Sequence, residues 1–363
     1  MFLLPPMKKC KLVVSDFHLG TGKRLPNGTL NPLEDFVHDS KFAEFLDFYS
    51  HGEYTETEVE LVFNGDMLNL TMTDYHGHFP VILTEKVGIS KVSSIIKGHP
   101  LFFEGLKKFL SVPHHTLTYV VGNHDQEMLW PGCRAKFEEA VGTAIQWKNF
   151  HYQTDGIHIE HGHQYEAANR VDPARPFLTE NLPEPILNLP WGTLFTIQFI
   201  VRLKLRRPAV DKIRPFKMLI WWSLFHDTWM TIRSLFALMS YFISTRFSKN
   251  RYRQSSLSTT LKIFFEASIF PDLTDAAKRI LRSPNIHSVV FGHSHVYKHV
   301  LVGGQKQYFN TGTWNDIVSL ELESFARRSK LTYVRVDYPN VEKPEPLLRH
   351  WIGSIPLEDD ALG

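Results

Sequence analysis

Residues 11–18 read KLVVSDFH, a short apolar run that ends in Asp16 and His18. Its β-branched residues and its length predict a buried strand over residues 11–15. In an extended segment, residues i and i+2 point to the same side, so Asp16 and His18 can address one point. The sequence therefore predicts a strand that presents a carboxylate and an imidazole where it ends.

The same arrangement recurs four more times along the chain. Apolar runs predict strands at residues 59–64, 116–121, 157–160 and 288–291. Each is followed at once by a polar motif: Gly65-Asp66, Gly122-Asn123-His124-Asp125, His161-Gly162-His163 and Gly292-His293-Ser294-His295. By the same reasoning His293 and His295 can address one point.

Helices are predicted between these strands. Apolar residues at helical spacing indicate helices at 40–50 and 87–110, the second interrupted at Pro100. Further strands are predicted at 307–309 and 331–336. Strands that alternate with helices predict an α/β sheet, in which ligands bind beyond the carboxyl ends of the strands.

The bulk composition limits the class of protein. The chain has 363 residues, 43% hydrophobic and 21% charged, which excludes a disordered polymer. A net charge of +2 argues against a surface devoted entirely to nucleic acid. Cys10 and Cys133 are too few for a disulfide framework and suit a reducing compartment. In the N-terminal MFLLPPMKKC the lysines follow the apolar run, the reverse of a secretory signal, so we expect a cytoplasmic protein.

Motif spacing divides the chain into four segments. A core is predicted in two parts, residues 1–166 and 279–338, separated by an insertion at 167–278. The insertion opens with prolines and then becomes aromatic, which predicts a helical cap or a membrane-contact region. Residues 339–363 are rich in proline and acidic residues and predict a surface-bound or frayed C-terminal tail.

The insertion concentrates positive charge and aromatic side chains. Residues 201–253 hold twelve Lys/Arg and two Asp, a net charge of +10. Four of the eight tryptophans lie in the insertion: Trp191, Trp221, Trp222 and Trp229. This composition is typical of an amphipathic helix in the interface of an anionic membrane. The alternative is a cap whose apolar faces pack on each other. Runs such as SLFALMSYFI are denser than base stacking needs, so no stable nucleic-acid partner is expected.

The residue types in the five motifs are those of a metal site. Carboxylates, imidazoles and an amide oxygen suit Mn²⁺, Fe or Zn²⁺, and the lack of cysteine ligands argues against a closed structural zinc site. A carboxylate such as Asp66 could bridge two metals roughly 3.5–4 Å apart. Each histidine taken alone is more often a surface or hydrogen-bonded core residue. The occurrence of all five motifs, each after an apolar strand, favours the metal site.

In its motif order (D-x-H, GD, GNHD, HGH, GHSH) the chain resembles the calcineurin-like metallophosphoesterase superfamily, over residues 10–165 and 285–340. The resemblance implies a four-layer α/β/β/α sandwich, here with a large inserted helical cap. It also implies two divalent metal ions, Mn²⁺ first and Fe or Zn²⁺ as alternatives. One metal would be held by Asp16, His18, Asp66 and His295, and the second by Asp66, Asn123, His161 and His293.

The resemblance further assigns roles around the metals. His124 would not be a ligand; it would stabilise the transition state or protonate the leaving oxygen, with Asp125 orienting its ring. His163 would line the phosphate site or support His161. Asn310 begins a sequence, NTGTW, that resembles the closing loop beside the site, although a simple turn fits equally well. Metal-activated water is the nucleophile, so no protein nucleophile is needed.

The insertion gives the chain some similarity to bacterial UDP-2,3-diacylglucosamine hydrolases, which cleave a lipid pyrophosphate at the cytosolic membrane face. The chain departs from them at His124, where they carry Arg, and at His163, where they usually carry Asp. The predicted function is a phosphoesterase or pyrophosphatase for a lipid-linked or membrane-associated phosphate, peripheral on the inner face of the cytoplasmic membrane. Alternatives are a soluble enzyme for nucleotides, nucleic acid or phosphoprotein, and a non-catalytic scaffold, which the complete ligand set disfavours.

Overall fold

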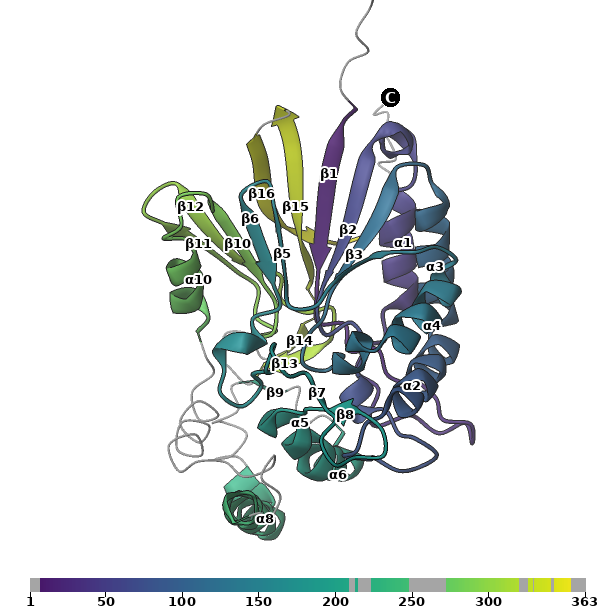
Figure 1. Cartoon of the computed structure of the whole chain (residues 1–363), viewed down its shortest axis with the longest axis vertical. Coiled ribbons are helices and arrows are strands. Elements are labelled where there is room, and N and C mark those ends of the chain that lie inside the picture. Colours follow the sequence, from purple (N-terminus) through teal and green to yellow (C-terminus); the bar gives the residue numbers. More distant parts are fainter. Residues whose placement is uncertain are drawn as a thin grey trace, which may run out of the picture.

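Two β-sheets packed face to face form the centre of the molecule (Figure 1). The computed structural model describes residues 7–208, 213–214, 223–247, 272–319, 326–328, 330–340 and 343–353. The first sheet has the strand order β16-β15-β1-β2-β3-β4 and the second has the order β11-β12-β10-β6-β5.

The strands of the first sheet are β1 (Lys9–Val14), β2 (Glu58–Asn64), β3 (His115–Val120), β4 (Gln146–Lys148), β15 (Leu331–Asn340) and β16 (Lys343–Trp351). Those of the second are β5 (His151–Thr154), β6 (Ile157–Glu160), β10 (Ser288–Phe291), β11 (Lys298–Val302) and β12 (Lys306–Asn310). Strands β1 to β4 are parallel, as are β6, β10 and β12. The carboxyl ends of the parallel strands of each sheet therefore meet at one edge.

Helices cover the outer face of each sheet. Four lie over the first sheet: α1 (Asp39–Phe48), α2 (Glu85–Gly98), α3 (Pro100–Ser111) and α4 (Pro131–Val141). The short α10 (Thr274–Ile280) lies over the second. Val13 and Val62 from one sheet and Ile159 and Val290 from the other pack between the sheets. The predicted four-layer α/β/β/α sandwich is confirmed.

The local sequence explains the layers. The central strands β1 and β2 are buried on both faces along most of their length, and the two buried charges among them, Lys11 and Glu60, pair with each other. Helix α3 buries Phe102, Leu106 and Phe109, one stripe at helical spacing. The interruption predicted at Pro100 is the boundary between α2 and α3, because proline fits the first turn of a helix but not its interior.

The C-terminal tail prediction is wrong for residues 343–351. They form β16, which pairs antiparallel with β15 along Leu331–Trp351 to Val336–Pro346. Proline enrichment suggested a frayed segment, yet proline is compatible with an edge strand, where one side of the backbone has no ladder partner. The register buries Pro344, Pro346 and Trp351, so side-chain burial offsets the missing N–H donors.

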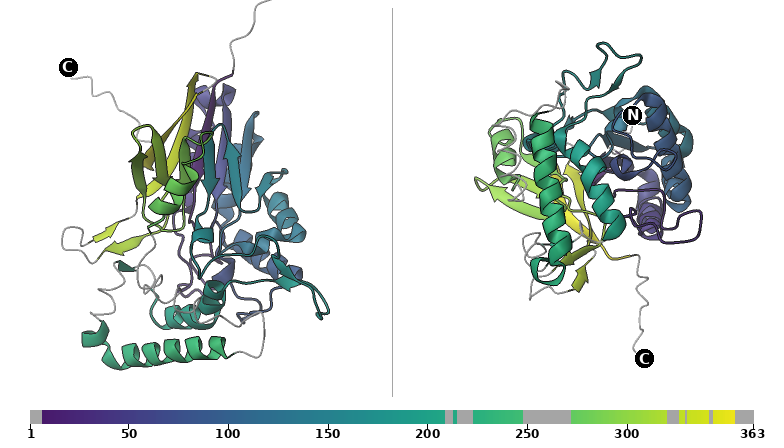
Figure 2. Two further views of the ribbon diagram at one scale, coloured as in Figure 1. Left: turned by 60° about the vertical axis from the view of Figure 1, so that its left-hand side comes forward. Right: turned by 90° about the horizontal axis from the view of Figure 1, so that it is seen from below.

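The insertion forms helices at the end of the molecule where the parallel strands terminate (Figure 2). Helix α5 (Trp191–Phe195), a π-helical turn (Thr196–Ile200) and α6 (Val201–Arg206) run on from one another, and α8 (Thr228–Arg246) follows. Short strands complete the fold: β7 (Phe177–Leu178) with β8 (Ile186–Leu187), and β9 (Ile213–Arg214) with β13 (Ile317–Ser319) and β14 (Ala326–Arg328). Trp221 and Trp222 lie outside the described residues. Among the described residues, no helix combines the length and apolarity needed to cross a bilayer.

Candidate metal centre

The five predicted motifs converge at the carboxyl ends of β1, β2, β3, β6 and β10, as the sequence predicted. Their donor atoms form three overlapping groups in which the atoms all lie within 4.8 Å of one another. The groups are Asp16–His18–His295, His18–Asp66–His124 and Asp66–His161–His293. These side chains are mostly buried, so the centre is a recessed polar site between the two sheets.

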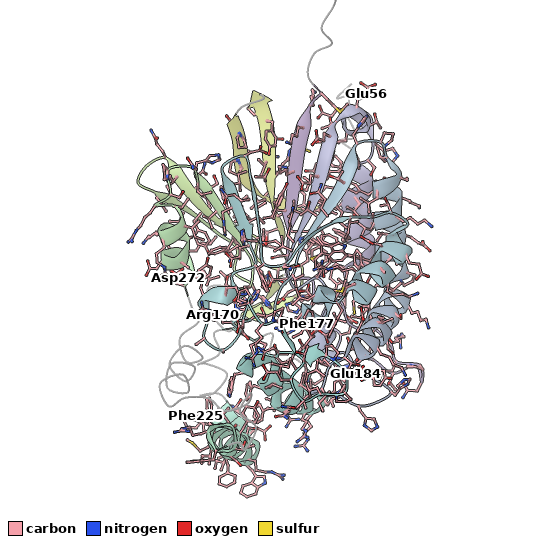
Figure 3. The ribbon with its side chains drawn as sticks, viewed as in Figure 1. Glu56, Arg170, Phe177, Glu184, Phe225 and Asp272 are labelled. Carbon is pink, nitrogen blue, oxygen red and sulfur yellow. The ribbon has the colours of Figure 1, made fainter. Side chains whose placement is uncertain are left out.

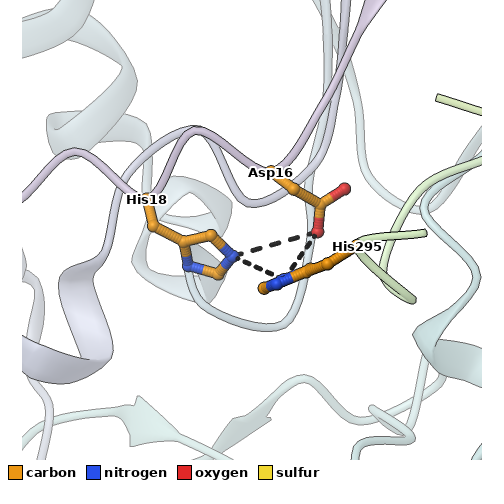
Figure 4. Close-up of side chains that lie close together, drawn as sticks. All are labelled: Asp16, His18 and His295. Carbon is orange, nitrogen blue, oxygen red and sulfur yellow. Dashed lines mark hydrogen bonds and ion pairs between the residues drawn. The ribbon is translucent and has the colours of Figure 1, made fainter. Parts of the chain in front are cut away.

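The first group brings together the end of β1 and the loop after β10 (Figure 4). Nε2 of His295 lies 3.3 Å from Oδ1 of Asp16 and 3.1 Å from Nε2 of His18. Nε2 of His18 lies 3.9 Å from the same Asp16 oxygen. Three donor atoms at these separations can face a single cation.

The third group, Asp66–His161–His293, is oriented by hydrogen bonds on the side away from the centre. Nδ1 of His161 lies 2.8 Å from the carbonyl oxygen of Asn64, which leaves Nε2 directed at Oδ2 of Asp66, 3.1 Å away. Nε2 of His293 contacts Oε2 of Glu166 at 2.7 Å, which leaves Nδ1 available to a cation. Such backbone and carboxylate partners fix the ring orientation of metal-binding histidines. Glu166 was missed by the sequence analysis, although it stands only three residues after His163.

Asp66 belongs to two of the three groups, which fits a carboxylate shared by two cations. One atom beside it supports this interpretation: Asn123 Oδ1 is buried and lacks a hydrogen-bond partner among the described residues. A buried acceptor without a partner is costly, and a cation would use its lone pair. The residues present therefore fit the dinuclear centre.

The backbone here is strained, and this changes one prediction. Five of the described non-glycine residues with positive φ lie in the centre: Asp16, His18, Asp66, His293 and His295, with φ between 51° and 68°. Such left-handed conformations are unfavourable for these residues and cluster at functional sites. Because the segments are not extended, the i, i+2 argument is wrong for His293 and His295, which belong to different groups.

Close packing at the centre also requires glycine. A Cβ at Gly65 would lie 2.5 Å from the ring of His161, and Gly65 has a φ of 81°. A Cβ at Gly122 would overlap the carboxylate of Asp66. The glycine that precedes each of these motifs thus lets the backbone approach the donor groups of another strand.

The two carboxylates of the centre carry the negative charge that a cation needs. Burial raises the pKa of Asp16 and Asp66, but the neighbouring imidazoles, His161 first, outweigh it and hold both carboxyl pKa values well below the usual range. Burial lowers the pKa of His161, whereas Asp66 and Asp16 raise it to about 10. Both carboxylates are therefore ionised across the physiological range.

His124 lies beside Asp66 but takes its orientation from a residue other than the one predicted. Nδ1 of His124 lies 3.0 Å from Oδ1 of Asn69, and burial lowers the pKa of its ring to about 3. Asp125 instead accepts hydrogen bonds from Met67 N, Tyr119 Oη and Gly122 N. Burial and the charge of Asp66 raise the pKa of Asp125 to about 7. The prediction that Asp125 orients the His124 ring is corrected, because Asn69 contacts the ring instead. The Asp125 carboxylate joins the loop after β2, at Met67, to the loop after β3, at Gly122.

The two tentative substrate residues differ. His163 is fully buried, 5.5 Å from the ring of His161, and neither of its nitrogens has a partner among the described residues. Asn310 donates to Gly292 O at 2.6 Å and accepts from Gly312 N at 3.0 Å. Its amide is occupied by backbone groups, so the expectation that Asn310 binds substrate is corrected.

The loop after Asn310 braces the first motif. Thr313 Oγ1 and Asn315 Nδ2 both donate to the carbonyl oxygen of Asp16, at 2.6 Å and 3.2 Å. Trp314 is buried and stacks on Phe17 with ring centroids 4.8 Å apart. The loop therefore stabilises the left-handed conformation of Asp16 through hydrogen bonds to its backbone carbonyl group.

Comparison with known proteins shows a match to one family model and a similarity to several solved structures. Residues 12–297 match the sequence model of the calcineurin-like phosphoesterase family. No curated protein gives a significant match. Similar solved structures include vacuolar protein sorting 29 from Cryptosporidium parvum, with 11% identity, a TM-score of 0.31 and coverage of 95% of this chain and 98% of that one. A dimetal phosphatase from Danio rerio has 8% identity, a TM-score of 0.35 and coverage of 95% and 100%.

Proposed function

Because the chain belongs to the calcineurin-like phosphoesterase family, and is thus a metal-dependent phosphoric ester hydrolase with a dinuclear centre, we propose that its substrate is a lipid-linked or membrane-associated phosphate ester or pyrophosphate. The observation that carries this proposal is the outward apolar face of α8. It lies at the same end of the molecule as the metal centre (Figure 1).

In this proposal the predicted ligands divide into two sets that share Asp66. Asp16, His18 and His295 would hold one cation with Asp66, and Asn123, His161 and His293 would hold the other. The donor groupings support the division, as does Asn123 Oδ1, which has no hydrogen-bond partner in the described part of the chain. Nitrogen and oxygen donors of this kind suit Mn²⁺, with Fe and Zn²⁺ as alternatives.

The chemistry combines bound cations with one histidine. When bound, two divalent cations supply an activated water nucleophile and neutralise the charge of the phosphate. The contact of His124 Nδ1 with Asn69 leaves Nε2 to face the centre. An anionic phosphate oxygen beside Nε2 raises the affinity of the ring for a proton, which places His124 to stabilise the transition state or protonate the leaving oxygen. His163, whose two ring nitrogens have no hydrogen-bond partner within the described part of the chain, would contact the phosphate.

Helix α8 has two apolar faces with different surroundings. Its inner face packs on α5: the rings of Tyr241 and Phe242 lie 5.4 Å and 4.9 Å from Trp191. Its outer face exposes Trp229, Ile232, Phe236, Met239 and Ile243, a stripe at spacings of three and four residues. Trp229 is 72% exposed and Phe236 is 77% exposed. An exposed stripe of large apolar side chains marks an interaction surface.

The position and charge of α8 favour a bilayer as the partner. The helix lies across the end of the molecule (Figure 2), and Phe225, 76% exposed, lies near it (Figure 3). Arg233 and Arg246 lie on the same helix, within the segment of net charge +10. Aromatic side chains with arginines are typical of helices that lie in an anionic interface. The free, buried Cys10 and Cys133 support a location on the cytoplasmic side of the membrane.

The proposal is tested with vesicles of phosphatidylcholine, with and without phosphatidylglycerol. We expect the wild-type protein to bind the anionic vesicles and the variant W229S/F236S/M239S to lose most of this binding. Both should hydrolyse a water-soluble p-nitrophenyl phosphodiester in Mn²⁺ at the same rate. The control variant I82S/L301S/L347S removes three exposed apolar side chains from other faces.

Each outcome decides between substrates or partners. Vesicle binding that is equal in wild type and the α8 variant contradicts the membrane assignment. Loss of self-association, rather than of vesicle binding, would assign the stripe to a second copy of the chain. Turnover that vesicles leave unchanged, and that is faster on nucleotides, would favour the soluble alternative.

A further inference from the structure

One lysine of the insertion reaches into the core and contacts a chain of groups that ends at His124. Lys204, on α6, is fully buried, and its Nζ lies 2.6 Å from both carboxylate oxygens of Asp35. Asp35 is 7% exposed and accepts a hydrogen bond from Asn69 Nδ2 at 3.4 Å. Asn69 is 1% exposed, and its Oδ1 lies 3.0 Å from His124 Nδ1.

The donors and acceptors along this chain can be arranged in one way. The ammonium of Lys204 is a donor only and contacts both carboxylate oxygens of Asp35, so these oxygens act as acceptors. Asn69 must therefore present its NH₂ group to Asp35, which turns its oxygen toward His124. An oxygen beside Nδ1 requires that Nδ1 carries a proton, and Nε2 then faces the centre.

The ion pair between Lys204 and Asp35 lies in apolar surroundings. Val201, Leu33 and Met72 form a buried apolar cluster around it, and Met72 Sδ lies 3.8 Å from Lys204 Nζ. A buried ion pair gains little stability over apolar side chains of similar size because both charges lose their hydration. A methionine and a leucine at these positions would pack as well. The ion pair therefore indicates a role other than stability, such as fixing the orientation of a neighbouring group.

We propose that Lys204 is a positioning residue: through Asp35 and Asn69 it holds His124 with Nδ1 protonated and Nε2 directed at the substrate. The insertion is then part of the catalytic apparatus as well as its cover. This inference rests on the role proposed above for His124, but the orientation of the ring can be measured independently of activity.

The test compares four variants. K204M leaves Asp35 buried and unpaired, and K204M/D35L removes the pair without leaving a buried charge, so the double variant should fold even if the single one does not. N69A removes the group that contacts the ring. R207Q is the matched control, because Arg207 follows α6 directly and pairs with Asp227 at 2.6 Å in an exposed position.

Two readouts are needed. The first is two-bond ¹H–¹⁵N correlation of ¹⁵N-histidine in the Zn²⁺-loaded protein, which distinguishes the two ring tautomers, with H124Q assigning the signal. The second is kcat on a p-nitrophenyl and a phenyl phosphodiester. A misoriented acid should slow the poorer leaving group by about tenfold and the better one by under about threefold.

We expect the Nδ1-protonated signature in wild type and R207Q, and its loss in N69A and K204M/D35L, with metal content unchanged. A folded K204M/D35L that keeps both the signature and the wild-type ratio of the two rates overturns the proposal and makes Lys204 purely structural. If the signature changes but no variant alters either rate, the positioning stands and the proposed role of His124 fails.

Discussion

Two described helical parts of the insertion differ in how much of their apolar surface they bury against the core. Residues 191–206 bury Ile197, Val201 and Lys204 against it. Helix α8 instead packs on α5 and leaves Trp229 and Phe236 more than 70% exposed. Both are rich in aromatic and basic residues, so composition does not separate them. The difference teaches that one inserted sequence can contain a part that packs into the core and a part that exposes large apolar side chains, which our proposals assign to positioning of His124 and to membrane contact.

The largest effect should come from removing the shared carboxylate. D66N should lower kcat on a p-nitrophenyl phosphodiester by on the order of 10³-fold or more, because both proposed metal sites lose a ligand. Metal analysis should show reduced metal content per chain, whereas anionic vesicle binding should not change. A D66N protein that loses vesicle binding as well would show that α8 and the centre are not independent.

The next largest effect should distinguish the buried ion pair from an exposed one on the same stretch of chain. K204M leaves the Asp35 carboxylate buried without its cation and should lower the free energy of unfolding by about 3–5 kcal/mol. R207Q removes an ion pair whose Arg207 side chain is 58% exposed, and should cost under about 1 kcal/mol. Urea denaturation measures both values, and equal losses would remove the distinction between the anchored and the outer parts.

The loop that contains Glu34 and Asp35, the residue that pairs with Lys204, should make the free energy of unfolding depend on pH. His99 is buried against Glu34, the neighbour of Asp35, and Asp39. Burial lowers its pKa, but hydrogen bonds with Asp39 and Glu34 outweigh this and raise it to about 9. A raised pKa gives stability that is complete below the unfolded value near 6.5 and is lost as the pH rises through about 9.

We therefore expect the free energy of unfolding to fall between pH 6.5 and 9 by on the order of 3 kcal/mol. H99Q should be less stable at pH 6.5 and should show no such fall. An identical pH profile in wild type and H99Q would contradict this account. Vesicle binding by α8 should be the same in both proteins at pH 6.5.

The smallest effect should come from the outer face. W229S/F236S/M239S should weaken binding to anionic vesicles by about tenfold or more, since each side chain would otherwise insert apolar surface into the interface. Its free energy of unfolding should stay within about 0.5 kcal/mol of wild type, because these side chains are exposed. A clear loss of stability would show that α8 buries this face within the protein.

The sequence alone predicted the architecture and the members of the centre. Strands that end in Asp, Asn or His are local patterns, and so is the break at Pro100, because burial periodicity and proline act within a few residues of chain. An α/β sheet and the convergence of Asp16, Asp66 and His161 followed from them, whereas the four-layer sandwich was implied by the resemblance of the motif order to a known family. Residues 343–351 were misassigned because proline content does not reveal whether a sheet edge stands nearby to pair with them.

Tertiary structure decided which groups orient these residues. Asn69 contacts His124 from 55 positions away, Glu166 contacts His293 from 127, and Lys204 reaches Asp35 across 169. No local pattern specifies such partners, because they depend on where separate loops meet after the sheets have packed. The left-handed backbone at His293 and His295 likewise sends neighbouring imidazoles to different groups. The local sequence thus indicates which residues form the centre, whereas the contacts that orient them depend on the tertiary structure.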